Sequence, residues 1–514
     1  MPMRGAPFRP SVRLRTEVED KHLTPESPTA TKPDASLLEH AVRVPLAGGW
    51  VSDSSEHFEV RSPFDGALIA SVPVLSDKHV DDALAAATRA APQVARMPAW
   101  ERSERLGRIA DRLSANAEEL AKTIALEAGK PIREARGEAS RAAYVFRWAA
   151  EEAKRLNGDW VPLDTEAGLG RRAAIVRRFP IGPVLAITPF NFPVTMPSHK
   201  VAPALAAGNP VLLKPATKTP LSALLLAEIV LEEDWPDGTL SVLPMEGSRT
   251  QQLARRDEIK GISFTGSDAI GWTLKAESPK KKVTLELGGN AAAIVEPDAD
   301  IGHAARRLVF GSFAYAGQVC ISTQRILIAD SVYDSFVTQF VDAVDALKSG
   351  DPLDDTTDFG PMIGGSEVER ISAWVEEAKQ AGASVATGGV RDGCFYRPTV
   401  LTDVPASARC LVEEVFGPVV SLIRYSDFGE AIEMANATRH GLHAAVFTQN
   451  LGAITAAHEL LDFGGIVVND APFFRAVQMP YGGVKDSGYG REGIGWAMRE
   501  MSEPRTLILP LEER

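Results

Sequence analysis

The chain has 514 residues, 45% of them hydrophobic, and carries a formal net charge of −13 at pH 7. Its length allows two or three domains with a large core, while its spread negative charge argues against a nucleic-acid partner and its lack of a long apolar run argues against a membrane span. Its three cysteines, Cys320, Cys394 and Cys410, form no CxxC pair or zinc-type cluster, which favours a reducing compartment, the cytoplasm, and no bound metal.

The N-terminal part of the sequence divides into a polar leader and a helical region. Residues 1–35 are rich in Pro, Ser, Thr and charge and have no hydrophobic periodicity, so we expect a disordered leader. From Asp77 to Lys130, apolar residues recur at helical spacing, and Gly129 followed by Pro131 predicts the end of a helix.

After residue 180, short apolar runs alternate with helix-like segments. The runs predicted to be strands are 184–187, 211–213, 240–243, 262–264 and 283–287. A second alternating stretch begins at Ala291 and includes 325–328, a helix over 331–347, and 419–423. Strands that alternate with helices are typical of parallel sheets, so the sequence predicts two doubly wound α/β domains.

Three local sequences could carry chemistry: PFNFP (189–193), LELGG (285–289) and FAYAGQVC (313–320). Taken singly, each has a plain structural reading. A cysteine such as Cys320 is more often a buried small hydrophobic residue than a nucleophile, Asn191 could be a turn residue, and Glu286 could be a solvated residue at a strand edge. Together they supply a thiol nucleophile, an amide that can stabilise an oxyanion and a carboxylate that can act as a base. This set of groups indicates acyl-transfer chemistry.

These motifs resemble the aldehyde dehydrogenase superfamily. Further matching segments are EAGKP (127–131), KPA (214–216), FTGS (264–267), EEVFGPV (413–419) and MPYGGVKDSGYGREG (479–493), so the resemblance runs from about residue 45 to the C-terminus. It implies a Rossmann-like cofactor domain, a catalytic domain and a β-strand oligomerisation arm in a homodimer or homotetramer. The implied boundaries are 36–157 with 181–288 for the cofactor domain, 289–485 for the catalytic domain, and 158–180 with 486–514 for the arm.

The resemblance also implies roles for the three residues. The Cys320 thiolate would attack an aldehyde, the Asn191 amide and the Cys320 N–H would hold the oxyanion, and Glu286 would activate water to hydrolyse the thioester. The product would be a carboxylic acid. A CoA-acylating semialdehyde dehydrogenase is an alternative that the presence of Glu286 disfavours, and a non-catalytic binding relative is disfavoured by the presence of all three residues.

The implied cofactor is NAD or NADP. The GxGxxG of Gly488, Gly490 and Gly493 follows no βα unit, so we reject it as a phosphate cradle. By resemblance, the cofactor residues are instead Lys214, Thr217, Gly247, Gly266, Ser267, Gly271, Leu287, Glu414 and Phe416. Thr217 stands where NAD-preferring members commonly carry an acidic residue, so the sequence predicts that NADP is accepted and leaves the preference open.

The substrate is expected to be a small aldehyde. By resemblance, Phe192, Val319, Ile321 and Arg475 line its tunnel, and the apolar majority favours an aliphatic or aromatic aldehyde. Arg475 would either recognise the acidic group of a semialdehyde or be exposed to solvent at the rim. The C-terminal motif also resembles the lactaldehyde and phosphonoacetaldehyde branch, but no basic residue adjoins Asn191 or Cys320, which argues against a phosphonate.

Overall fold

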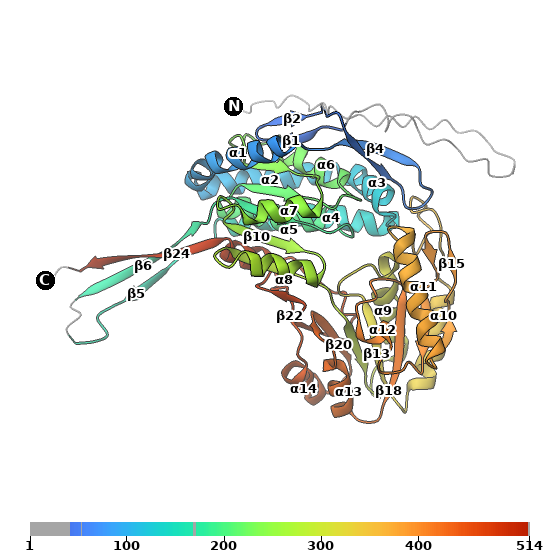
Figure 1. Cartoon of the computed structure of the whole chain (residues 1–514). Coiled ribbons are helices and arrows are strands. Elements are labelled where there is room, and N and C mark those ends of the chain that lie inside the picture. The colour runs from blue at the N-terminus through green and yellow to red at the C-terminus, as the bar shows by residue number, and fades with distance from the viewer. Residues whose placement is uncertain (1–41, 53, 168–170, 512–514) are drawn as a thin grey trace, which may run out of the picture.

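The computed structural model describes residues 42–52, 54–167 and 171–511, and the predicted leader lies outside these residues. Figure 1 shows one lobe in blue and green, a second lobe in yellow and red, and a thin arm that projects from the body and carries the C-terminus. We call these the cofactor lobe, the catalytic lobe and the arm. The division into three parts follows the three main sheets.

Two small antiparallel pairs and four helices open the cofactor lobe. The pairs are β1 (Val44–Leu46) with β2 (Gly49–Val51) and β3 (His57–Arg61) with β4 (Leu68–Pro73), and the helices are α1 (Asp77–Arg96), α2 (Ala99–Ala115), α3 (Ala117–Ala128) and α4 (Ile132–Ala153). Ser76 caps α1 in a capping box with His79, and Gly129 ends α3 with φ 68°, as its sequence predicts. Among the described residues, no helix combines the length and apolar character needed to cross a membrane.

The cofactor lobe is built on a six-stranded sheet in the order β23-β11-β10-β7-β8-β9. Its strands are β7 (Val184–Ile187), β8 (Val211–Lys214), β9 (Leu240–Val242), β10 (Gly261–Thr265), β11 (Lys282–Glu286) and β23 (Gly488–Tyr489), and its crossover helices are α5 (Thr195–Ala207), α6 (Leu221–Leu231), α7 (Gly247–Arg255) and α8 (Asp268–Glu277). Only β23 is antiparallel. The strands lie where the apolar runs predicted them, because a parallel strand covered on both faces must be apolar throughout.

The catalytic lobe contains a seven-stranded sheet in the order β14-β17-β18-β13-β12-β20-β21. Its strands are β12 (Ala291–Val295), β13 (Thr323–Ala329), β14 (Ser384–Thr387), β17 (Thr399–Thr402), β18 (Val419–Tyr425), β20 (His443–Phe447) and β21 (Gly465–Val468). Its helices are α9 (Ile301–Phe313), α10 (Tyr333–Asp345), α11 (Gly365–Gln380), α12 (Arg409–Val412), α13 (Phe428–Asn436) and α14 (Leu451–Leu460), with the short pairs β15 (Arg391–Asp392) with β16 (Phe395–Tyr396) and β19 (His440–Gly441) with β22 (Val484–Lys485). Two doubly wound α/β units are therefore present, as predicted.

The arm is a three-stranded antiparallel sheet of β5 (Asp159–Pro162), β6 (Arg172–Pro180) and β24 (Ser502–Pro510). Trp160, Leu507 and Ile508 on it are each more than half exposed. Residues 488–500, which we assigned to the arm from sequence, lie elsewhere: β23 pairs with β11 and α15 (Ile494–Glu500) packs on α5. Gly488 allows this course because a Cβ there would lie 2.5 Å from the carbonyl oxygen of Leu285.

Candidate active site

The segment before Cys320 has an unusual backbone. After α9, a 3₁₀ turn (Ala314–Gly317) places Tyr315 and Ala316 at φ 46° and 52°, and Gly317 follows at φ 68°. A left-handed conformation costs a residue other than glycine about 1–2 kcal/mol. A Cβ on Gly317 would overlap the carbonyl oxygen of Gly417, so that position requires glycine. The turn reverses the chain and brings Cys320 to the wall of a cavity.

Contacts with both lobes hold this strained turn. The Tyr315 hydroxyl donates to the carbonyl of Ala128 at 2.7 Å, and the Tyr315 N–H donates to Glu134 at 3.1 Å; both partners belong to the cofactor lobe. From the catalytic lobe, the Ile363 N–H donates to the Gln318 side chain at 2.9 Å. The nucleophile segment is therefore fixed where the two lobes meet.

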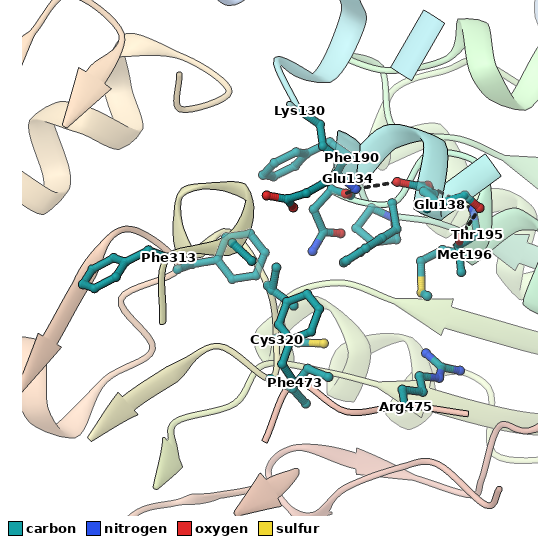
Figure 2. A pocket seen from close by; sticks show the side chains of 18 of the residues that line it. Lys130, Glu134, Glu138, Phe190, Thr195, Met196, Phe313, Cys320, Phe473 and Arg475 are labelled. Carbon is teal, nitrogen blue, oxygen red and sulfur yellow. Dashed lines mark hydrogen bonds and ion pairs between the residues drawn. The ribbon is translucent and has the colours of Figure 1, made fainter. Parts of the chain in front are cut away.

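Cys320 faces a cavity of about 920 Å³ between the lobes. Figure 2 shows its sulfur in this space, with Phe473 and Arg475 on the same side. The Sγ lies 3.4 Å from the Tyr481 hydroxyl, and burial raises the pKa of the Cys320 thiol to about 11. The thiol is therefore protonated at neutral pH in this state, whereas the sequence analysis assigned the attack to a thiolate. Tyr481 was not among the site residues predicted from the sequence.

Asn191 lies across the cavity wall from the nucleophile segment. Its side-chain NH₂ donates to the carbonyl of Gln318 at 2.8 Å, and its Oδ1 has no hydrogen-bond partner among the described residues. The side chain is buried, and both Asn191 and Cys320 line the cavity. The structure therefore brings the predicted amide donor and the predicted nucleophile to one site.

A buried ion pair supports the backbone around Asn191. The Lys130 ammonium, from the short link between α3 and α4, pairs with Glu138 on α4 and donates to the Asn191 carbonyl at 2.7 Å. Its charge also lies 3.8 Å from the ring centroid of Phe192. Glu138 in turn accepts the N–H of Thr195 at 3.1 Å, as Figure 2 shows. A buried charge that is fully paired in this way fixes the geometry of the segment it contacts.

Glu286 ends β11 and is 3% exposed. Neither carboxylate oxygen has a hydrogen-bond partner among the described residues. Burial, and next the negative charge of Glu492, raise the pKa of Glu286 well above its ordinary value. An unpartnered carboxylate with a raised pKa next to a reactive site is typical of a general base.

Glu492 organises a second charged cluster beside Glu286. It binds Lys200 of α5 at 2.7 Å and Arg475 at 2.9 Å, and all three side chains are buried. Desolvation disfavours its charge, yet Lys200 and Arg475 lower the pKa of Glu492 to about 2. Arg475 is therefore not exposed at the rim, which was one of its two expected placements. Glu492 lies within the GxGxxG segment, whose glycines allow it to run along the sheet edge.

The predicted cofactor residues divide into two groups. Gly266, Ser267, Leu287, Glu414 and Phe416 line the cavity, whereas Lys214, Thr217, Gly247 and Gly271 do not. Ser267 is the N-cap residue of α8 and its side chain makes no capping hydrogen bond, and the neighbouring Thr265 hydroxyl has no partner among the described residues. Free donors at a helix N-terminus suit a pyrophosphate, so these residues fit a dinucleotide cofactor.

At two of the predicted cofactor positions, glycine is required for a reason other than the one we expected. We expected Gly266 and Gly271 to allow a close approach of the cofactor. In the structure, a Cβ on Gly266 would lie 2.6 Å from the ring of Phe264, and one on Gly271 would overlap Leu287. Their small size is therefore required by packing within the chain.

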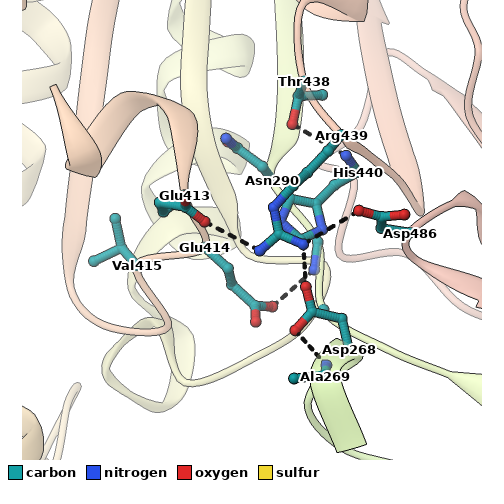
Figure 3. Close-up of polar contacts among 12 residues, drawn as sticks. Asp268, Ala269, Asn290, Glu413, Glu414, Val415, Thr438, Arg439, His440 and Asp486 are labelled. Carbon is teal, nitrogen blue, oxygen red and sulfur yellow. Dashed lines mark hydrogen bonds and ion pairs between the residues drawn. The ribbon is translucent and has the colours of Figure 1, made fainter. Parts of the chain in front are cut away.

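A cluster of carboxylates around Arg439 supports the loop that carries Glu414. Figure 3 shows Arg439 contacting Asp268 at the start of α8, Asp486, and Glu413, whose carboxylate lies 3.0 Å from it. Glu414 accepts the N–H of Gly289 at 2.8 Å, and burial raises the pKa of Glu414 to about 7. Arg439 therefore ties the start of α8 in the cofactor lobe to the loop that presents Glu414 in the catalytic lobe.

The remaining cavity wall is aromatic and cationic. Phe192, Val319 and Ile321, the predicted substrate residues, all line it together with Arg475. Besides Lys130 and Arg133, which pair with Glu138 and Asp358, two cations that were not predicted from the sequence also line it: Arg141 of α4 and Arg306 of α9. Among the described residues, neither forms a salt bridge, although Arg141 donates to the Arg475 carbonyl at 3.3 Å. No sequence motif distinguishes Arg141 from the other arginines of its helix.

Comparison with known proteins identifies the class. The family model described as "Aldehyde dehydrogenase family" matches residues 50–507. The 3-sulfolactaldehyde dehydrogenase of Priestia megaterium is 42% identical over 90% of this chain and 97% of its own length. Aldehyde dehydrogenase 21 from Physcomitrella patens, in complex with the reaction product succinate, is 43% identical with a TM-score of 0.89, over 91% of this chain and 98% of its own. A glyceraldehyde-3-phosphate dehydrogenase from Methanocaldococcus jannaschii, complexed with NADP, is 38% identical with a TM-score of 0.85, over 89% of this chain and 100% of its own.

The chain belongs to the aldehyde dehydrogenase family. It is an NAD(P)-dependent enzyme that oxidises an aldehyde to a carboxylic acid. The resemblance drawn from the motifs is thereby confirmed.

Proposed function

We propose that Cys320, Asn191 and Glu286 perform this oxidation on a small aldehyde that carries an acidic group. The observation that carries the proposal is that one cavity holds the thiol, the amide and several arginines, among them Arg141 and Arg475. The cavity has the size and the mixture of apolar wall and few polar groups expected of a small-molecule site.

The Cys320 sulfur attacks the aldehyde carbon once its proton has been lost, and a thiohemiacetal forms. The carbonyl oxygen then carries negative charge beside the Asn191 amide, which is already held in place through Lys130 and the Gln318 carbonyl. The nicotinamide of the bound dinucleotide supplies the oxidant. Loss of the aldehyde hydrogen as a hydride, which a nicotinamide held at this site would accept, leaves an acyl group on Cys320 as a thioester.

Glu286 completes the reaction by activating water. In its carboxylate form it takes a proton from the water that attacks the thioester, which releases the acid and restores the thiol. Its raised pKa makes it a stronger base than an exposed glutamate. The positive charges of Arg475 and Lys200 oppose this rise and favour the base form.

The acidic group of the substrate would be bound by Arg141. Arg141 is exposed and lines the cavity, and desolvation, followed by the charge of Arg475, lowers its pKa. An anion between the two arginines would offset their mutual repulsion. Names of similar proteins agree with this chemistry, since sulfolactaldehyde and succinate both carry an acidic group.

Replacing Arg141 with Gln tests this assignment. We expect kcat/KM for succinate semialdehyde to fall roughly 10- to 100-fold, because a charge-assisted hydrogen bond to its carboxylate is lost. For butanal, which has no acidic group, kcat/KM should change less than about twofold. The matched control is Arg147→Gln, since Arg147 lies on the same helix and pairs with Asp111. Equal losses on both aldehydes in the Arg141 variant would exclude acid recognition.

We also propose that NADP is accepted. Thr217 is exposed after β8 and carries no charge, and burial lowers the pKa of the nearby Lys214, so this position itself offers no carboxylate to repel a 2′-phosphate. Thr217→Glu is expected to lower kcat/KM for NADP about tenfold or more, while Thr217→Gln leaves it within about twofold. A wild-type preference for NAD of about a hundredfold would contradict the proposal.

The arm is proposed to join subunits into a homodimer or homotetramer. Its exposed Trp160, Leu507 and Ile508 and its free strand edges support this, because such edges and apolar side chains are covered in stable proteins. The molar mass in solution distinguishes these states from a monomer.

A further inference from the structure

Tyr481 is buried beside the nucleophile and holds its hydroxyl against the reactive sulfur. The residue is 2% exposed, and its oxygen lies 3.4 Å from Cys320 Sγ. No other hydrogen bond of this hydroxyl is found among the described residues. Burying a hydroxyl costs desolvation free energy, and a phenylalanine would fill nearly the same volume without that cost. The buried Tyr481 hydroxyl therefore indicates a role beyond packing.

The ring of Tyr481 is fixed on several sides. The Arg475 guanidinium lies 3.8 Å from its centroid, and the His443 ring packs against it edge-on with centroids 5.1 Å apart. Its backbone exchanges two hydrogen bonds with Glu492, at 3.0 and 2.7 Å. Arg475 is itself held by Glu492, so the position of the hydroxyl is determined before any substrate binds.

We propose that Tyr481 is a further catalytic residue, whose phenol donates a hydrogen bond to the Cys320 sulfur and thereby stabilises the thiolate that attacks the aldehyde. The inference rests on the proposed role of Cys320 as nucleophile. A hydrogen bond to the charged form of a group favours that form, and the bond is stronger when the acceptor is an anion. The phenol keeps its proton throughout, so it acts as a donor and never as the base.

The electrostatics of the pair agree with this direction of donation. Burial raises the pKa of Tyr481 well above its ordinary value, so the phenol keeps its proton at neutral pH. Burial also raises the pKa of Cys320, and the Tyr481 hydrogen bond is the largest effect that lowers it. Burial in the cavity disfavours the thiolate form of Cys320, and this hydrogen bond opposes that effect.

The test is the titration of Cys320 in a Tyr481→Phe variant. The rate of Cys320 alkylation by iodoacetamide, measured against pH in the absence of aldehyde, reports the thiolate fraction. We expect the apparent pKa of the thiol to rise by about one unit, so that alkylation at a fixed lower pH is roughly tenfold slower. We also expect kcat/KM for the aldehyde to fall by a similar factor, with an unchanged dissociation constant for the dinucleotide.

Tyr425→Phe is the matched control, because that hydroxyl is bonded to Val295 and Glu296 in the catalytic lobe and not to Cys320. It should leave the alkylation profile unchanged. An unshifted profile in Tyr481→Phe would overturn the inference even if turnover fell, since a purely structural tyrosine would affect turnover alone. Retained turnover in a Cys320→Ala variant would instead overturn the proposed function.

Discussion

A Cys320→Ala variant is expected to lose aldehyde-dependent NAD(P)H formation by a factor of about 10⁴ or more, because no other group in the cavity can form the thioester. The dissociation constant of the dinucleotide should change by less than about twofold, since alanine removes only the sulfur. Turnover is measured from the initial rate of absorbance change at roughly 340 nm, the band of the reduced nicotinamide. The dissociation constant of the dinucleotide is measured by calorimetric titration.

The matched control for this variant is Cys410→Ala. Cys410 is buried in α12, within a different apolar cluster from the one that contains Val319 and Ile321. Its loss should lower stability slightly and leave kcat unchanged. Turnover of the Cys320 variant at the wild-type rate would exclude covalent catalysis by this residue.

A Glu286→Gln variant is expected to form about one equivalent of NAD(P)H per site quickly and then to turn over about 10³-fold more slowly than the wild type. The first phase survives because it does not require Glu286, and the second is lost because the amide cannot take a proton from water. Rapid mixing with a saturating aldehyde measures both phases.

The pH dependence provides the second part of this test. The pKa of Glu286 is raised, so the base form increases as pH rises through that raised value, and steady-state turnover should rise with it. The Glu286 variant should lose this rise. Glu277→Gln is the control, because Glu277 pairs with Arg255 on the surface. If the Glu286 variant hydrolysed the thioester at the wild-type rate, another base would be required, and an assay for acyl-CoA would test the remaining CoA-acylating alternative.

The fold followed from the sequence because parallel strands covered on both faces must be apolar along their whole length. Strands β7 and β12 lie at apolar runs for this reason. The course of residues 488–500 could not be predicted in the same way. Strand β23 has only two residues, and its place beside β11 depends on a close backbone approach at Gly488 rather than on any hydrophobic pattern.

The chemical groups of the site were predicted better than their surroundings. Cys320, Asn191 and Glu286 stand in motifs whose residue types already suggest a nucleophile, a donor and a base. Tyr481 and Arg141 reach the cavity because segments far apart in sequence meet there; Tyr481 stands in the matched segment 479–493, but its contact with Cys320 depends on the fold, and no local motif marks Arg141. Burial also changed the expected protonation of Cys320, and burial is a property of the folded chain alone.

The left-handed turn at Tyr315–Gly317 has a consequence for how the enzyme acquires its activity. Its hydrogen bonds to Ala128 and Glu134, and the bond from Asn191 to Gln318, close loops of well over a hundred residues. Contacts so distant in sequence form late, because the chain entropy lost in closing such loops is recovered only once both lobes have docked. In a partly folded chain Cys320 therefore lacks the groups that act with it, so catalytic competence requires the completed docking of the two halves.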